Sequence, residues 1–477
     1  MPRAPEPKTL SELKGIVGSG GWLDTPADIA PLLTDHRHLY QGASPLILLP
    51  RSTVEVAAIL AHCNACDVAV VPQGGNTSYC GAATPDASGT QVVLAMRRMN
   101  RVRSIDADNY SMIVEAGVTL AAAQSAARDA NRLFPLSLGS EGTAQIGGNL
   151  STNAGGTAVL RYGMMRDLVF GLEVVLADGR VISGLTCLRK DNTGYDTKSL
   201  FIGAEGTLGI ITAASLKLFA LPQDVVTALI GVDSAQRALD LLVRLRGAAG
   251  DQVTGFEIMP QRAVELCVEH IEGVANPLAQ RAAWYVLAEF SSPNVAQGLN
   301  DLLTAQLEAA AGDGLIVDAM IATSMAQAKA MWKLREGIAA AQSRQGESLK
   351  HDISVPITAL PALIERGTKL AQELVPEGEV ISYGHLGDGN LHFNVSQRRG
   401  ADSKAFLARK PVLEEAMFDL VAELGGSFSA EHGIGQLRAQ QLARRADPAE
   451  LAVMHSIKKA LDPKGLLNPG KVLLRRS

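Results

Sequence analysis

The chain has 477 residues, of which 47% are apolar and 19% charged, and its formal net charge is −5. This length exceeds what one hydrophobic core supports, so at least two domains are expected, and the composition excludes a disordered chain. The weak negative charge, without blocks of like charge, argues against a nucleic-acid-binding protein.

The sequence gives no sign of export or of membrane anchoring. The first residues combine prolines and charges without an apolar signal region, and no uncharged apolar run approaches the roughly 20 residues that cross a bilayer. Five cysteines, an odd number, indicate a reducing compartment. We therefore expect a cytoplasmic protein without a transmembrane segment.

Residues 1–221 predict an α+β domain. Short apolar, β-branched runs bounded by glycine predict strands, and "LADGR" predicts a hairpin between two of them. The stretch "TLAAAQSAARDANRL" predicts a helix that ends near Asn131. A domain boundary is expected at Leu221-Pro222, because the residue before a proline is disfavoured in a helix.

The remainder of the chain predicts two further parts. Residues 222–425 alternate longer helical patterns with strands, which predicts a mostly antiparallel sheet with helices on one face. In residues 426–477, Asp447 is expected to cap a helix that begins at Pro448. The tail "LDPKGLLNPGKVL" then predicts an extended segment.

Three glycine-rich segments are candidate nucleotide-binding elements: Pro72–Ala82, Pro135–Gly163 and Lys190–Thr212. In the first, Gly74 and Gly75 would let backbone N–H groups approach a pyrophosphate, and a structural tight turn is the alternative. Neither a Walker A motif nor the G-x-G-x-x-G of a Rossmann domain is present.

The segment "YGHLGDGNLHFN" predicts a strand, a turn and a strand, because its glycines exclude a helix. His385 and His392 would flank the turn, and Asn394 would share a strand face with His392. "EHGIG" adds a carboxylate and a third imidazole. These residues could form a metal site, and buried core histidines are the alternative interpretation. Asp388 is expected to form an Asx-turn rather than to bind a metal.

These segments occur in a recognisable order. The three glycine-rich stretches, "HLGDGNLHFN", "EHGIG" and "NPGKVL" resemble the vanillyl-alcohol-oxidase-type flavoproteins, and most of all their D-lactate and D-2-hydroxyglutarate dehydrogenase branch, from about Leu46 to Leu474. The resemblance implies an α+β fold with a two-subdomain FAD-binding domain (1–221) and an α+β substrate domain with an antiparallel sheet that carries the metal-ligand hairpin (222–425). A C-terminal segment (426–477) would return to the FAD domain and close on the flavin.

The same resemblance implies the cofactor site. Asn76 stands where relatives with covalently attached FAD often carry a histidine, so non-covalent FAD is expected. The residues implied to bind it are Pro72, Gly74, Gly75, Asn76, Thr77, Gly142, Thr143, Gly147, Gly148, Asn153, Ala154, Gly155, Gly206, Ile210 and Asn468.

The implied chemistry is oxidation of an alcohol. His385, His392 and Glu431 would bind a divalent metal, expected to be zinc, although the ligand set also suits iron(II) or manganese. His432 would be the catalytic base that removes the hydroxyl proton while the C2 hydrogen passes as hydride to flavin N5. The residues implied to bind substrate are Arg335, Lys350, Asn394 and His432.

The substrate and the electron acceptor are less well defined. A D-2-hydroxy acid is expected, D-2-hydroxyglutarate first and D-malate or D-lactate next, but Ala339 replaces the threonine of the hydroxyglutarate enzymes and leaves broader aliphatic substrates open. The acceptor is expected to be an electron-transfer flavoprotein or a quinone rather than NAD or oxygen, and the family implies a homodimer. The alternatives are an oxidase and, from another class, a metallohydrolase with structural glycine loops.

Overall fold

The computed structural model describes residues 3–475 and divides the chain into two compact units. Unit 1 comprises the residues up to Gly156, Gly163–Leu221 and those from His432 onward, and unit 2 comprises Thr157–Tyr162 and Pro222–Glu431. The chain therefore leaves unit 2 a few residues after the expected boundary at 425/426. The assignment of Thr157–Tyr162 to unit 2 was not predicted.

Unit 1 begins with a four-stranded sheet in the order β1-β2-β4-β3, in which β3 and β2 both run parallel to β4. Its strands are β1 (Trp22–Leu23), β2 (Ile47–Leu48), β3 (Ala69–Gln73) and β4 (Gln91–Ala95). The accompanying helices are α1 (Pro7–Val17), α2 (Pro26–Ile29) and α3 (Thr53–Ala65), with short 3-10 turns at Ala30–Leu32 and Met96–Arg98. Buried side chains of α1 and α3 pack with those of the sheet in one apolar core, which fixes the strand that leads into the first glycine-rich segment.

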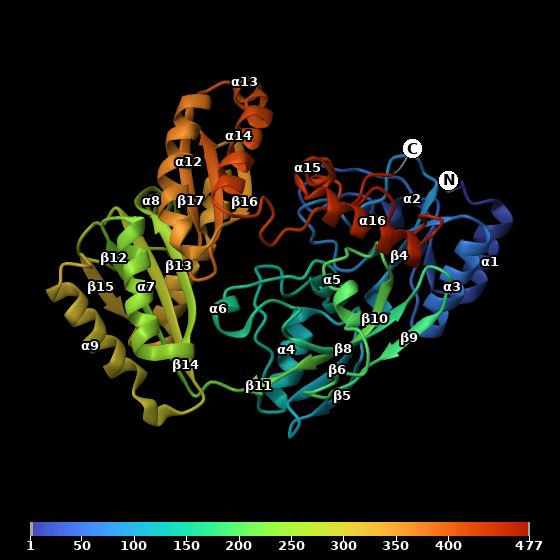
Figure 1. Ribbon diagram of the computed structural model, residues 1–477, viewed down its shortest axis with the longest axis horizontal. Helices are drawn as coiled ribbons and strands as arrows, with labels where there is room; N and C mark the ends of the chain where they lie inside the picture. Colours follow the sequence, from blue (N-terminus) through green and yellow to red (C-terminus); the bar gives the residue numbers. More distant parts are fainter. Residues whose placement is uncertain (1–2, 476–477) are drawn as a thin grey trace. The chain divides into compact units, whose positions relative to one another are not determined.

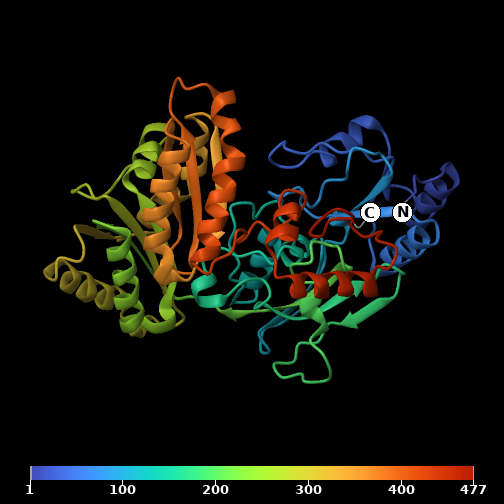
Figure 2. The same cartoon turned by 45° about the horizontal axis from the view of Figure 1, so that its top comes forward.

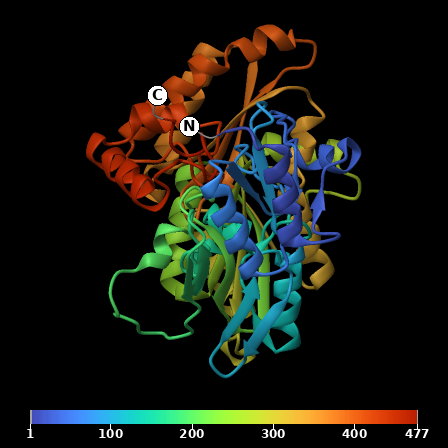
Figure 3. The ribbon, with the colours of Figure 1, turned by 90° about the vertical axis from the view of Figure 1, so that its right-hand side faces the viewer.

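A five-stranded antiparallel sheet, in the order β5-β6-β10-β8-β9, forms the second layer of unit 1. Its strands are β5 (Val102–Asp106), β6 (Ser111–Glu115), β8 (Val169–Val175), β9 (Val181–Gly184) and β10 (Ile210–Lys217), and β7 (Arg132–Leu133) pairs separately with β11 (Phe219–Ala220). The hairpin predicted at "LADGR" is confirmed, since Leu176 N donates to Arg180 O at 2.8 Å between β8 and β9. The loop after β9 projects from this unit before a 3-10 turn at Thr197–Leu200 (Figures 2 and 3).

Two helices, α4 and α5, belong to this part of unit 1. Thr119 accepts a hydrogen bond from Ala122 N and starts α4 (Leu120–Asp129), which ends close to the predicted Asn131. A short helix, α5 (Ile146–Ser151), lies inside the second glycine-rich segment.

The C-terminal part of the chain belongs to unit 1 and contains α15 (Ala439–Arg445) and α16 (Pro448–Leu461), drawn in red in Figure 1. Asp447 caps α16 through the N–H groups of Ala449 and Glu450, as predicted. The tail is not helical, as expected, but it is bent rather than extended, with turns at Pro463–Lys464 and Pro469–Gly470. Leu467 forms a parallel bridge with Val70 of β3.

Unit 2 is built on a seven-stranded antiparallel sheet in the order β15-β12-β14-β13-β17-β18-β16. The strands are β12 (Asp224–Val232), β13 (Val253–Pro260), β14 (Trp284–Ser292), β15 (Asp318–Ile321), β16 (Ser348–Ser354), β17 (Gly378–His385) and β18 (Asn390–Gln397). Its helices are α6 (Val159–Tyr162), α7 (Ala235–Ala249), α8 (Gln261–His270), α9 (Leu299–Gly312), α10 (Met325–Glu336), α11 (Ile338–Ser343), α12 (Leu360–Leu374), α13 (Ser403–Ala408) and α14 (Lys410–Glu423), with 3-10 turns at Gly250–Gln252, Val295–Gln297 and Ile357–Ala359.

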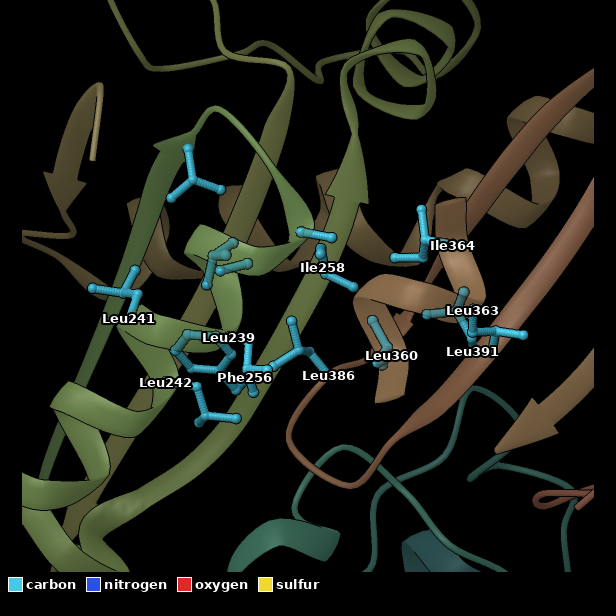
Figure 4. Packing of buried hydrophobic residues seen from close by; sticks show 14 of the residues in the cluster. Leu239, Leu241, Leu242, Phe256, Ile258, Leu360, Leu363, Ile364, Leu386 and Leu391 are labelled. Carbon is cyan, nitrogen blue, oxygen red and sulfur yellow. The ribbon is translucent and has the colours of Figure 1, made fainter. Parts of the chain in front are cut away.

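The expectation of helices on one face of this sheet is wrong. Leu229 and Ile230 are both fully buried, yet they point to opposite faces and belong to different cores. Helices α7, α9, α12 and α14 cover the face shown in Figure 4, and α8, α10 and α11 cover part of the other. The signal was present in the sequence, because a strand buried on both faces reads as a continuous apolar run such as "VTALIGV".

Among the helices of residues 3–475, none combines the length and the apolar composition that a bilayer crossing requires.

Candidate active site

The first two glycine-rich segments meet directly in unit 1. A Cβ atom on Gly75, in the turn that follows β3, would lie 1.9 Å from Thr143 O, so only glycine permits this approach. Its neighbour Gly74 lies beside Gln145 and the backbone of Gly148. Backbone groups more than 60 residues apart along the sequence thus line one surface, as a bound pyrophosphate requires.

The third segment joins the same surface. Gly206 has φ +69°, and a Cβ there would lie 2.3 Å from the Cγ of Pro72, at the end of β3. Asn468 is 1% exposed and donates from Nδ2 to Ala82 O at 3.0 Å and to Glu205 O at 2.7 Å. The C-terminal tail therefore ties the first and third segments together.

Several predicted cofactor residues use their side chains inside the protein. Asn76 donates from Nδ2 to Thr34 O at 2.8 Å, and Asn153 Oδ1 accepts from Arg166 N at 2.9 Å. Ile210 is buried in the apolar core beneath the first sheet. These three residues can offer only backbone groups to a cofactor, because the side chains of Asn76 and Asn153 bond to neighbouring loops and that of Ile210 packs in the core.

Other polar side chains around this surface are buried without a partner. Gln73 Oε1, Gln145 Oε1, Asn149 Nδ2 and Asn468 Oδ1 make no hydrogen bond within residues 3–475. Buried polar atoms without partners are rare, since each costs about 1–3 kcal/mol. Four of them beside glycine-lined backbone fit a polar cofactor such as FAD, which would supply the missing donors and acceptors.

A second group of functional side chains lies in unit 2, on the sheet face that α8, α10 and α11 partly cover. Glu257 on β13 pairs with His385 at the end of β17. His392 on β18 lies between Tyr383 of β17 and Asp352 of β16. Directly paired residues present their side chains on the same face of a sheet, so the pairing of the strands is enough to place these side chains in one row. The predicted strand, turn and strand are confirmed, and Asp388 forms the predicted Asx-turn by accepting from Asn390 N at 3.0 Å.

One buried carboxylate in this row is shared by two cationic groups. Glu257, 1% exposed, accepts from Arg335 Nε at 2.7 Å and from His385 Nδ1 at 2.6 Å. Burial raises the pKa of Glu257, but the charges of Arg335 and His385 outweigh it and lower the pKa to about 2. For His385 the signs are reversed: burial lowers its pKa, but the Glu257 charge outweighs the effect of burial and raises the pKa to about 9. Because Nδ1 donates to Glu257, Nε2 is the atom through which His385 could bind a metal, after losing its proton.

Arg335 is not a solvated arginine, which is the usual state of an arginine in a helical stretch such as "MWKLREGIAA". It is 9% exposed at the end of α10, and its guanidinium carbon lies 4.9 Å from the centre of the Tyr383 ring. Only Nε is engaged by a hydrogen bond within residues 3–475. The terminal nitrogens can therefore fork onto a substrate carboxylate.

The structure brings His392 and Glu431 together with Asp352. One ligand atom from each lies within 4.8 Å of the others, and His392 Nε2 is 3.7 Å from Glu431 Oε1. Burial raises the pKa of Glu431 to about 7; His385 opposes this increase, and Asp352 and Asp388 add to it. Facing carboxylates beside imidazoles fit a divalent cation, which would offset their mutual repulsion. The His385 ring, whose centre is 5.7 Å from that of His392, stands beside this group.

Three further predicted site residues are His432, Lys350 and Asn394. His432 directly follows Glu431 in the chain and begins the C-terminal stretch of unit 1, and its ring centre lies 4.6 Å from that of Tyr79. Lys350 is exposed on β16 opposite Asn394. Asn394 is 3% exposed and donates to Gln342 Oε1 at 3.0 Å, so part of its amide is already engaged.

Sequence reasoning missed several of these residues. Asp352 lies two positions after Lys350 on the same strand face, and this period-two spacing could have identified it. Glu257 is a charge inside the apolar strand "VTGFEIMP", which signals a buried partner. Gln73, Gln145 and Asn149 lie within the first two glycine-rich segments, but only the structure shows that a polar atom of each side chain is buried without a hydrogen-bond partner.

Known proteins match most of the chain. A family model described as "FAD binding domain" matches residues 44–184, and one described as "FAD linked oxidases, C-terminal domain" matches residues 221–472. The chain is 39% identical to "D-2-hydroxyglutarate dehydrogenase, mitochondrial" of Bos taurus over 97% of this chain and 83% of that protein. It is 36% identical to a "D-2-hydroxyglutarate--pyruvate transhydrogenase" of Saccharomyces cerevisiae, over 94% and 90% of the two chains.

Solved structures share the fold. An alkyldihydroxyacetonephosphate synthase aligns with a TM-score of 0.76 at 19% identity, over 98% of this chain and 87% of that one. A p-cresol methylhydroxylase aligns with a TM-score of 0.75 at 15% identity, over 98% and 96%. The fold is that of the vanillyl-alcohol-oxidase-type flavoproteins, as expected. The chain belongs to the FAD-linked oxidases, in the branch of the D-2-hydroxyglutarate dehydrogenases.

Proposed function

We propose that this protein oxidises D-2-hydroxy acids to 2-oxo acids with FAD as the hydride acceptor, and that D-2-hydroxyglutarate is its first candidate substrate. The observation that carries the proposal is the buried Arg335–Glu257 pair on the sheet face that also holds Asp352, His392 and Glu431. A fixed guanidinium beside a cation-binding group suits a substrate with a carboxylate next to a hydroxyl. The names of the Bos taurus and Saccharomyces cerevisiae relatives support the same substrate.

Arg335 would hold the carboxylate next to the hydroxyl carbon. Glu257 and the Tyr383 ring keep the guanidinium in place before substrate arrives, so little conformational entropy is lost on binding. Lys350 would bind a distal carboxylate, and Asn394 would contribute to the same end of the substrate. Ala339 provides no hydroxyl there, so D-malate, D-lactate and longer aliphatic D-2-hydroxy acids are further candidates.

The residues would divide the chemistry between proton removal and orientation. When bound, FAD supplies the acceptor for the C2 hydrogen, and a divalent cation, proposed to be zinc, supplies positive charge for the hydroxyl oxygen. His392 and Glu431 would hold the cation together with His385 or Asp352. His432 would accept the hydroxyl proton, because a neutral imidazole is a base suited to neutral pH.

The FAD is proposed to be non-covalent, because Asn76 cannot form the link that a histidine makes. An electron-transfer flavoprotein or a quinone would reoxidise it. The name of the yeast relative adds a 2-oxo acid as a second acceptor class to test. The FAD-binding match over residues 44–184 argues against the metallohydrolase alternative.

A screen of D- and L-2-hydroxy acids with a dye acceptor, before and after chelation, tests this proposal. We expect turnover with D-2-hydroxyglutarate and little with its L enantiomer. Removal of the cation should lower turnover by roughly 100-fold, and added zinc should restore it. Equal rates with both enantiomers, or full activity in protein shown to be metal-free by elemental analysis, would contradict it.

A further inference from the structure

The loop that carries His432 is held by one buried carboxylate of unit 1. Glu205 Oε1 accepts from Ile434 N at 2.7 Å, and Glu205 Oε2 accepts from Gly435 N at 2.8 Å. Glu205 is 5% exposed and lies in the third glycine-rich segment, more than 200 residues earlier in the chain. Each oxygen thus receives one backbone donor from the loop.

The loop has little freedom to move away from this carboxylate. Gly433 has φ +76°, and a Cβ there would lie 2.7 Å from Glu205 Oε1. Gly435 has φ +52°, and a Cβ there would lie 2.1 Å from Cys80 O. Because both glycines are in direct contact with their neighbours, a shift of the backbone would break the two hydrogen bonds to Glu205.

Cys80 and Gly81, in the first glycine-rich segment, support the other side of the His432 loop. Cys80 O accepts from Gln436 N at 2.9 Å, and Gln436 Nε2 donates to Gly81 O at 2.9 Å. The preceding residue, Tyr79, packs its ring against His432. The imidazole and the backbone that follows it are therefore both fixed within unit 1.

The main chain of Glu205 belongs to the surface that fits FAD. Its N–H donates to Ser151 O at 2.8 Å, and its carbonyl accepts from Asn468 Nδ2 at 2.7 Å. The next residue is Gly206, which packs on Pro72. A single residue thus connects the glycine-rich segments to the loop of His432.

A carboxylate is the side chain that this position requires. Both of its oxygens only accept, whereas an amide of the same shape would turn an N–H₂ group toward one of the two backbone donors. Burial raises the pKa of Glu205 to about 7, and the two backbone N–H groups and Lys471 oppose that increase. Such a group is costly to bury for packing alone, because an apolar side chain would fill the space without losing hydration.

We propose that Glu205 is a positioning residue for His432: its carboxylate fixes the loop of the base, and its main chain fixes that loop to the FAD-binding segments. This inference rests on the role of His432 in the proposed function. Glu205 does not act on the substrate itself; it keeps the base in the orientation that proton removal needs.

The test compares Glu205→Gln and Glu205→Ala in the full-length, FAD-loaded protein. Glutamine keeps one acceptor and alanine keeps none, so we expect the limiting rate of flavin reduction by D-2-hydroxyglutarate to fall by roughly 10-fold and roughly 100-fold respectively. The dissociation constants of substrate and FAD should stay within about twofold of the wild-type values. Hydrogen–deuterium exchange at Ile434 and Gly435 should accelerate in the same order.

Glu115→Gln is the matched control. Glu115 is, like Glu205, a buried carboxylate of unit 1, but it pairs with Arg101 and Arg103 and not with the loop. We expect this variant to lose stability and keep the wild-type reduction rate. A wild-type reduction rate in Glu205→Gln with faster exchange at Ile434, or loss of FAD as its main defect, would overturn the positioning role. If D-2-hydroxyglutarate reduces the flavin of His432→Ala at the wild-type rate, His432 is not the base, and the proposed function rather than the role of Glu205 is contradicted.

Discussion

Replacing His432 with alanine should leave a yellow protein whose flavin is reduced by D-2-hydroxyglutarate about three orders of magnitude more slowly. The proposed base is lost, whereas the glycine-rich segments that fit FAD are packed on one another and do not depend on the imidazole. Anaerobic stopped-flow reduction gives the rate, and the absorbance of the purified protein gives the FAD content.

His36→Ala is the control for this variant. His36 is exposed and packs its ring edge-on against Tyr79, with ring centres 5.7 Å apart, so both histidines contact the same tyrosine. Only the loss of His432 should slow reduction. Comparable rates in His432→Ala and the wild type would remove the assigned base.

Replacing Arg335 with methionine should have two large effects. Substrate affinity should fall by roughly 100-fold, because the fork onto the carboxylate is lost. Unit 2 should lose about 3–5 kcal/mol of stability, because Glu257 would keep only His385 as a partner in a buried position. Substrate titration of flavin reduction measures the first effect, and denaturant unfolding measures the second.

Two further variants separate these effects. Combining Arg335→Met with Glu257→Gln removes the unpaired charge, so stability should partly recover while substrate affinity stays low. Arg262→Met removes an arginine from a half-exposed pair with Glu379 and should cost less than about 1 kcal/mol. The account of Arg335 is contradicted if substrate affinity returns in the double variant or is unchanged in Arg335→Met.

Local signals in the sequence predicted much of the fold. The cap at Asp447, the helix end near Asn131, the hairpin at "LADGR" and the turn at Asp388 depend on neighbouring residues alone, and all are present. The glycines at 75 and 206 were also informative, because close backbone approach leaves few other choices.

What the sequence could not provide depends on pairing between distant segments. Asp352 and Glu257 join the histidines only through the register of β16, β18, β17 and β13. The bonds from Glu205 to the loop of His432 cross more than 200 residues. The two-sided sheet of unit 2 is a different case, because the continuous apolar run "VTALIGV" does indicate a strand buried on both faces.

The proposed function depends on the transfer of the C2 hydrogen from a D-2-hydroxy acid to FAD held by this chain. The most direct test mixes the purified protein with D- or L-2-hydroxyglutarate without oxygen and follows flavin absorbance and 2-oxoglutarate together. We expect the D enantiomer to bleach the flavin and yield an equal amount of 2-oxoglutarate, and the L enantiomer to leave the protein yellow. A protein that purifies without flavin, or a flavin that no D-2-hydroxy acid reduces, would contradict it.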